Sequence, residues 1–143
     1  MSARQLCSLV VVFILLGCGR ANEQSAPRMA NEGFNLAESE RETLIQQAAG
    51  GAAQAAFRLS EYYGLYLGNS AEHERWLRRA TELGHALAAY NLGATFERRK
   101  SVSEARHFFS LALERARAEG NAGLASAAEE SLAHLPRAWS PVP

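Results

Sequence analysis

The sequence predicts an all-α protein built as a short helical-repeat solenoid, with about six helices in antiparallel pairs. Alanine, leucine, glutamate and arginine dominate the middle of the 143-residue chain, and all four favour helices. No alternating run rich in valine, isoleucine or threonine interrupts them, so no strand is expected. The middle of the chain also repeats itself with a period near 33 residues. Periods of roughly 20 to 50 residues with helical content are typical of solenoids.

The repeat is visible in two pairs of segments. Ala55–Tyr63 aligns with Ala88–Phe96 at an offset of 33, with alanines, aromatic residues and a leucine in matching places. Trp76–Ala80 aligns with Phe108–Ala112 at an offset of 32. The one-residue difference falls in the loop between two helices, where a change of length costs little.

The six helices are expected near residues 37–49, 52–66, 71–83, 86–99, 103–119 and 121–135. The first carries Leu44 and Ile45 ahead of a Gly50-Gly51 stop, as the second helix of an incomplete repeat would. The next four form the two aligned pairs. The fifth helix is about one turn longer than its counterpart. The sixth carries leucines and alanines at helical spacing, caps the stack, and ends before Pro136.

The second repeat unit resembles a tetratricopeptide repeat. The matching positions are Leu92, Gly93, Phe96, Ala105, Phe109 and Ala112. Small residues at such positions let two antiparallel helices approach, and the larger ones fill the space between them. The resemblance implies a right-handed solenoid. The first unit has Ser60 in the glycine place, and residues 76–86 are also similar to a Sel1-like repeat, although that family's glycine- and aspartate-containing loop is missing.

The amino terminus carries an export signal. One cation, Arg4, precedes an apolar run over residues 6–16, about half the length that a membrane-spanning helix needs. The run ends in Leu15-Leu16-Gly17-Cys18, which resembles the lipobox of bacterial lipoproteins. The resemblance implies cleavage before Cys18, a diacylglycerol on its thiol and acylation of the new amine. Gly19 in place of aspartate implies sorting to the outer membrane of a Gram-negative cell, facing the periplasm. In the alternative, a plain secretory signal is cut elsewhere and Cys18 stays unmodified.

These features divide the chain into four parts. We expect a lipoprotein signal peptide over residues 1–17, a flexible polar tether over 18–36, the helical repeat domain over 37–135 and an irregular tail over 136–143. Cys7 lies in the signal and Cys18 would be acylated, so no disulfide is expected in the mature chain.

The composition argues against catalysis. The net charge is zero, aspartate is absent, and no pair of the four histidines has metal-ligand spacing. No phosphate-binding glycine loop or nucleophile elbow is present. We therefore expect no enzyme, cofactor, metal or small-molecule substrate, and the exported location argues against nucleic acid. The arginine runs near residues 75–79 and 98–100 fit solvated helix faces. Alternatively, they form a patch for anions or acidic partners, or are attracted to anionic lipid headgroups.

The tetratricopeptide resemblance also implies a groove that binds a partner peptide. Phe57 and Tyr90 occupy groove-lining places in that family. The same resemblance implies that the groove includes Gln54, Arg58, Glu61, Leu87, Asn91 and Ala94, with Glu97 and Arg98 beside it. The lysine–asparagine clamp that some members use is not reproduced. An amphipathic or extended segment of an envelope protein would suit this lining.

Together these expectations describe a membrane-anchored lipoprotein that acts as an interaction scaffold or adaptor in the bacterial envelope. The alternative is a structural subunit of an envelope assembly, such as secretion or pilus machinery. An enzyme is the third and weakest possibility.

Overall fold

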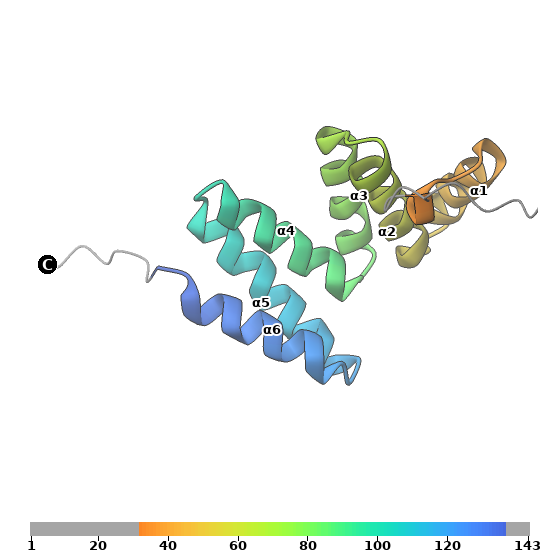
Figure 1. Ribbon diagram of the computed structural model, residues 1–143. Coiled ribbons are helices and arrows are strands. Elements are labelled where there is room, and N and C mark those ends of the chain that lie inside the picture. The colour runs from red at the N-terminus through yellow and green to blue at the C-terminus, as the bar shows by residue number, and fades with distance from the viewer. Residues whose placement is uncertain (1–31, 137–143) are drawn as a thin grey trace, which may run out of the picture.

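The protein is helical throughout the part of the chain that the computed structural model describes, residues 32–136 (Figure 1). A 3₁₀ turn, η1 (Glu32–Phe34), comes first. The α-helices are α1 (Glu38–Ala49), α2 (Ala53–Glu61), α3 (Ser70–Glu82), α4 (Ala86–Arg98), α5 (Val102–Ala118) and α6 (Ala122–His134). A π-helical turn, η2 (Tyr62–Tyr66), follows α2 directly. No strand occurs within these residues, so the prediction of an all-α fold is confirmed.

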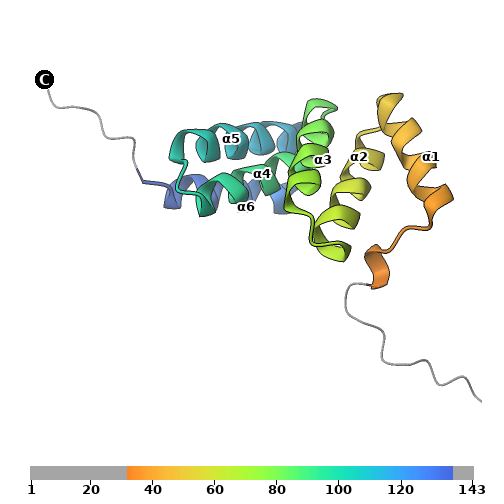
Figure 2. The ribbon, with the colours of Figure 1, turned by 90° about the horizontal axis from the view of Figure 1, so that it is seen from above.

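Each helix packs against the next one along the chain, from α1 to α6. Figures 1 and 2 show two groups of three, α1–α3 and α4–α6, whose axes cross at a steep angle. The turn η1 and the end of α6 lie at opposite ends of the molecule (Figure 2). The change of direction falls between α3 and α4, so these two helices form a corner.

Several helices begin at a side-chain cap. The side chains of Asn69, His85 and Asn121 accept hydrogen bonds from the first-turn amides of α3, α4 and α6, at 3.1, 3.2 and 3.1 Å. Such caps satisfy amide donors that have no carbonyl partner within the helix. At the other end of α3, Gly84 adopts a φ of 103°, which lets the chain turn sharply into α4.

The core is made of a few large side chains set among many alanines. Leu59, Leu77, Leu92 and Phe109 are almost fully buried, and the helices that carry them meet through small residues. A Cβ atom at Gly93 would lie only 2.6 Å from the Phe109 ring, so α4 and α5 approach more closely than any larger residue permits. This matches the physical reason given above for a small residue at that position.

Two long-range contacts hold the corner between the helix groups. Arg115 of α5 donates a 2.6 Å hydrogen bond to the backbone oxygen of Thr81, in the last turn of α3. Glu74 of α3 pairs with Arg99, at the end of α4, at 2.7 Å. A cation suits the carboxyl end of α3 because unpaired carbonyls gather there.

Most predicted helix limits agree with the structure to within one residue. The exception is the helix expected over residues 52–66, where the α-helix ends at Glu61 and a π-turn follows. In this turn the amide of Leu67 donates to the oxygen of Tyr62, five residues back, at 3.1 Å. The predicted signal peptide, with Cys18, most of the tether and all of the tail beyond Pro136 lie outside the described residues.

Candidate functional site

The aromatic residues of the predicted groove serve internal packing. Phe57 is only 7% exposed, and its ring stacks on His85 with centroids 4.3 Å apart. Tyr90 is half-buried, packs against Phe109 at 5.3 Å and forms a 3.2 Å hydroxyl hydrogen bond with Ser131 of α6. Both rings were expected to line an open groove. They are covered because the start of α4 closes over α2 and because α6 folds back along α4.

The polar groove residues of α2 are engaged by the chain's own neighbouring segments. Arg58 donates a 3.0 Å hydrogen bond to the backbone oxygen of Gly33 and pairs with Glu61 at 3.7 Å. Its guanidinium lies 6.0 Å from the Phe34 ring, so η1 covers this part of α2. Gln54 bonds through its side-chain oxygen to Nε2 of His85 at 2.9 Å.

The remaining predicted groove residues lie on α4 in three different environments. Leu87 is exposed, at 39%. Asn91 is half-buried, and its backbone oxygen accepts from the Thr95 hydroxyl at 2.9 Å. Ala94 packs on a buried cluster that includes Phe109 and Leu135. The structure therefore does not gather the eight residues around one open groove. Their role in binding a partner stays a prediction.

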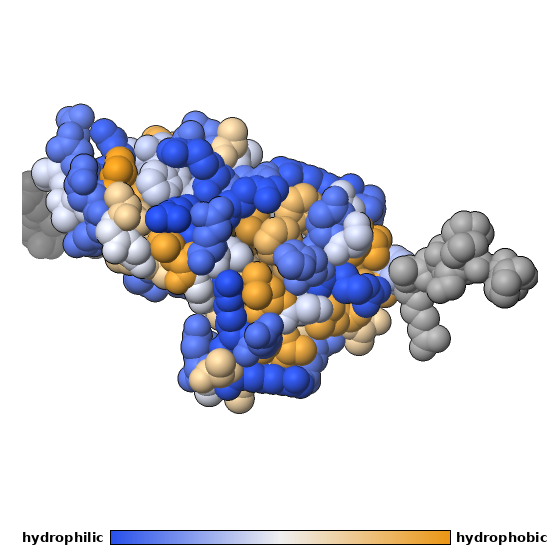
Figure 3. Space-filling view, turned by 180° about the vertical axis from the view of Figure 1, so that it is seen from behind, coloured by the Kyte–Doolittle hydropathy of each residue, from blue (hydrophilic) through white to orange (hydrophobic). Residues whose placement is uncertain are grey.

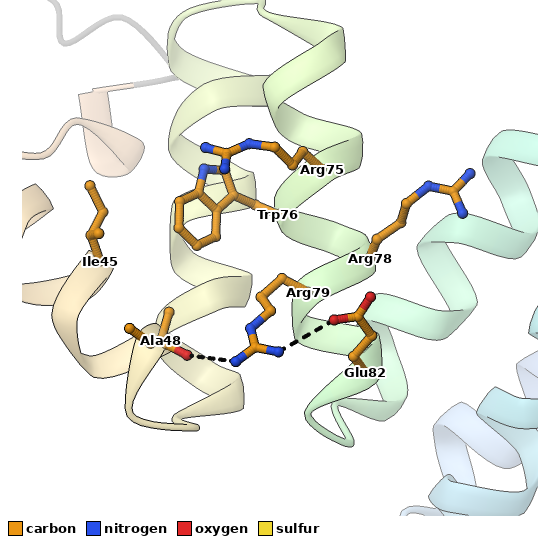
Figure 4. A pocket seen from close by; sticks show the side chains of 8 residues that line it. Ile45, Ala48, Arg75, Trp76, Arg78, Arg79 and Glu82 are labelled. Atoms are coloured by element: carbon orange, nitrogen blue, oxygen red, sulfur yellow. Dashed lines mark hydrogen bonds and ion pairs between the residues drawn. The ribbon is translucent and has the colours of Figure 1, made fainter.

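A hollow of about 610 Å³ opens between α1 and α3 (Figure 4). Its lining consists of Ile45, Ala48, Ala49, Arg75, Trp76, Arg78, Arg79 and Glu82. In Figure 4 Ile45 faces the hollow from one side and Trp76 from the other, while Arg78 points away toward α4. Apolar atoms thus form the floor and charged groups form the rim.

Arginine side chains surround Trp76. The Arg75 guanidinium lies 4.7 Å from the centroid of the indole, a cation–π arrangement. Arg79 reaches across the hollow to the backbone oxygen of Ala48 at 3.5 Å, and it pairs with Glu82 of its own helix at 3.4 Å (Figure 4). Trp76 is 8% exposed, and its indole N–H has no acceptor among residues 32–136. The nitrogen itself is buried beneath the Arg75 guanidinium (Figure 4), so a partner in the hollow would meet the ring of Trp76 and not its N–H.

A charge cluster stands beside this hollow, at the corner between α3 and α4. Glu74 accepts from Arg78 and Arg99, each at 2.7 Å. The hydrogen bond from Arg99, with a further one from Arg78, lowers the pKa of the Glu74 carboxyl. Both guanidiniums also lie over the Phe96 ring, at 5.3 and 5.7 Å. The cluster fixes the arginines in place and keeps the carboxylate ionised.

The histidines have mainly structural partners. His73 forms a 2.8 Å hydrogen bond through Nδ1 with the backbone oxygen of Ser60, and His85 caps α4. Burial lowers the pKa of the His85 imidazole. Within residues 32–136 no group of three or more histidine, cysteine or glutamate side chains could hold a metal ion. No helix in this part of the chain is long and apolar enough to cross a membrane.

The surface seen in Figure 3 does not carry one continuous apolar belt. Apolar residues appear there as separate patches among hydrophilic side chains. We take the hollow between α1 and α3 as the candidate site because it combines apolar side chains with arginines. It suits a partner segment with an apolar face for Ile45 and Trp76 and with carboxylates for Arg75 and Arg79, because guanidinium and carboxylate groups form paired hydrogen bonds.

Sequence reasoning missed this hollow. The basic run around Trp76 favoured a solvated face, with a patch for acidic partners as the alternative, and nothing in the sequence placed α1 opposite it. Trp76 was expected in the core, and the structure buries it there. The alanines at the end of α1 complete the site only after folding. Comparisons with protein-family models, curated proteins and solved structures found no match.

Proposed function

We propose that this protein is a membrane-anchored lipoprotein that acts as a protein–protein interaction adaptor in the bacterial cell envelope. The hollow between α1 and α3 carries the proposal. Its apolar side chains and its arginine rim suit a partner segment with one apolar and one acidic side. Acyl chains on Cys18 would hold the adaptor at the periplasmic face of the outer membrane.

The arrangement of helices supports the adaptor role. The pairs α2–α3 and α4–α5 recur in sequence, and each helix packs against the next one along the chain. We propose that these helices form a short tetratricopeptide- or Sel1-like solenoid. Solenoids expose long surfaces that commonly bind other proteins. A lipid anchor raises the local concentration of such a domain near envelope partners, which offsets a modest affinity.

Membrane fractionation tests the anchor. Acyl chains contribute about 0.8 kcal/mol for each buried methylene, so a protein with several chains stays in the membrane pellet. The variant Cys18→Ser should move to the soluble periplasmic fraction, and its mass should lack the lipid. If the variant remains in the pellet as tightly as the natural chain, the lipoprotein proposal is wrong.

Site-specific photo-crosslinking in cells tests the adaptor role. A photoreactive residue at Ile45 should give a discrete adduct with a second envelope protein, whereas one at Glu114, on the exposed side of α5, should not. Arg75→Glu should abolish the Ile45 adduct by repelling the partner's carboxylates. Arg117→Glu is the matched control, because Arg75 and Arg117 are 62% and 64% exposed and each pairs with one glutamate. Equal loss in both variants, or no adduct at Ile45, would reject the adaptor role.

A further inference from the structure

Two leucines stand out on the surface at one edge of the helix stack. Leu65 and Leu67 are 51% and 50% exposed, the highest values for large apolar side chains among residues 32–136. They flank Tyr66 in the turn that joins α2 to α3. Isolated exposed leucines are common on protein surfaces, but two in one short turn need a further explanation.

The π-turn holds these leucines outward. The amides of Leu67 and Asn69 donate to the carbonyls of Tyr62 and Tyr63, at 3.1 and 2.7 Å, and these bonds close the turn. Tyr62 is buried and stacks on Tyr66, with centroids 5.7 Å apart. The tyrosines thus fix the inner side of the turn, and the two leucines are left on its outer side.

This edge is also where the described part of the chain begins. The turn η1 packs against η2, and Figure 2 shows η1 beside the end of α2. Thirteen residues, 19–31, separate Cys18 from Glu32. A chain of that length spans about 50 Å at most. An acyl group on Cys18 would therefore keep the edge that carries η1 and the leucines within about 50 Å of the bilayer.

A cation lies near the same edge. Arg98 lines a hollow together with Ser70, three residues after Leu67. Its guanidinium donates to the Thr95 hydroxyl at 3.2 Å but forms no ion pair within the described residues. The same hollow also contains Glu74 and Arg99, which pair with each other. Exposed leucines and a cation without an ion pair favour contact with anionic phospholipid, because the leucines enter the interface while the cation meets the headgroups.

We propose that the Leu65–Leu67 turn is a membrane contact, which docks the helical domain edge-on against the phospholipid surface that holds its anchor. This inference rests on the proposed lipid anchor at Cys18. The contact would give the domain a fixed orientation on the bilayer, with η1 and η2 next to the lipid and α6 far from it.

Fluorescence of single-cysteine variants tests the contact. In the acylated chain Cys18 is blocked, so Leu65→Cys, Leu67→Cys or Leu87→Cys would each supply one free thiol for an environment-sensitive dye. Leu87 is the matched control, an exposed leucine at the start of α4. Each labelled protein is reconstituted into vesicles of phosphatidylethanolamine and phosphatidylglycerol, and circular dichroism checks that the helices are retained.

The dye at positions 65 and 67 should shift to shorter emission wavelengths and be quenched by spin-labelled lipid, and the dye at position 87 should show neither effect. If positions 65 and 67 remain as solvent-exposed as position 87, the membrane contact is overturned. The same variants with a hexahistidine tag in place of residues 1–18, bound to nickel-chelating lipid, separate the two proposals. They bring the domain to the bilayer even if Cys18 proves not to be acylated, so a failed anchor cannot be mistaken for a failed contact.

Discussion

At the scale of single residues, Gly93 sets the distance between α4 and α5. A Cβ atom there would meet three atoms of the Phe109 ring at 2.6 to 2.9 Å. The aligned position in the first repeat is Ser60, which is fully buried and whose hydroxyl donates a 2.6 Å hydrogen bond to the backbone oxygen of Phe57. The residue of the first repeat that aligns with Phe109 is Leu77, which is not aromatic. The first pair of helices therefore accepts a side chain at this position that the second pair cannot.

Gly93→Ala should lower the free energy of unfolding by about 1–3 kcal/mol, because the methyl group overpacks the helix interface. Urea denaturation followed by circular dichroism measures the change. Adding Phe109→Leu should make the glycine substitution less costly than it is alone, since the ring is what the methyl group meets. Gly123→Ala is the control, because a Cβ at this α6 position meets only the Asn121 side chain, at 3.8 Å. Equal losses in both glycine variants would show that the close approach is unimportant.

His85 couples the cap of α4 to the core. Its Nδ1 accepts from the amide of Ala88 at 3.2 Å, which places the ring proton on Nε2, where it is donated to Gln54. The ring also stacks on Phe57. A protonated imidazole cannot accept at Nδ1, so charging His85 breaks the cap as well as placing a cation in a half-buried site.

Stability should therefore fall as the solution is acidified below about pH 6.5. Burial lowers the pKa of His85 in the folded chain from its usual 6.5, so the unfolded chain binds more protons between that value and the lower folded value. The contribution is fully present above pH 6.5 and is lost as the pH falls toward the folded pKa. Thermal melts at pH 7.5 and 5.5 measure it. His85→Asn keeps a capping side chain and should show a smaller difference between the melting temperatures at pH 7.5 and pH 5.5. An unchanged difference would mean that His85 is not responsible.

At the scale of elements, η1 behaves as a strap across α2. Arg58 binds the backbone of Gly33 and lies over Phe34, while Leu36 is 4% exposed in the main core. The strap covers part of the face that the repeat resemblance assigns to a partner peptide. It lies within the last residues of the predicted tether, 18–36, so this end of the tether is packed against the helical domain.

Arg58→Ala should release the strap while leaving α2 folded, because Arg58 is partly exposed and its contacts are made to η1 and to Glu61. Amide hydrogen exchange at residues 33–36 should accelerate by about fivefold to tenfold, which corresponds to the loss of roughly 1 kcal/mol of local hydrogen bonding. Exchange in the helix core at Leu59 should be unchanged. If residues 33–36 exchange as in the natural chain, Arg58 does not hold the strap.

Sequence patterns predicted the helices well, since their limits depend on local signals such as the Gly50-Gly51 stop and the Asn121 cap. The π-turn after α2 could not be predicted in the same way. A Cβ at Gly64 would lie 2.4 Å from Nδ1 of His73, a residue nine positions later in another helix. The turn therefore depends on a tertiary contact, in which His73 also binds the backbone oxygen of Ser60.

At the scale of the whole molecule, the corner between α3 and α4 determines which surfaces are exposed. The family resemblance predicted that Phe57 and Tyr90 line a groove, but the packing of α4 and α6 covers both rings. The hollow beside Trp76 arises from the distance between α1 and α3, which no local pattern records. The candidate site was thus harder to predict than the fold, since it depends on how helices that are far apart in sequence are placed.

Arg115→Ala should loosen this corner without unfolding either group of helices. The guanidinium connects α5 to the last turn of α3 through the oxygen of Thr81, and a hydrogen bond to a charged group contributes about 1.5–3 kcal/mol. Small-angle scattering should show a broader distribution of interatomic distances, and hydrogen exchange should rise at residues 81–86. Arg106→Ala, which removes a 2.8 Å hydrogen bond to Pro136, is the control at the far end. A scattering profile identical to that of the natural protein would show that Arg115 does not stiffen the corner.

Lys100 provides a single site for amine-directed labelling. It is the only lysine in the sequence, it is exposed, and it sits with a φ of 62° in the short turn between α4 and α5. If the amine of Cys18 is acylated, Lys100 carries the one free primary amine of the mature chain. Amine-directed reagents would then modify the protein at a single known point, one copy of the reagent for each molecule, and would leave the arginine-lined hollow chemically untouched.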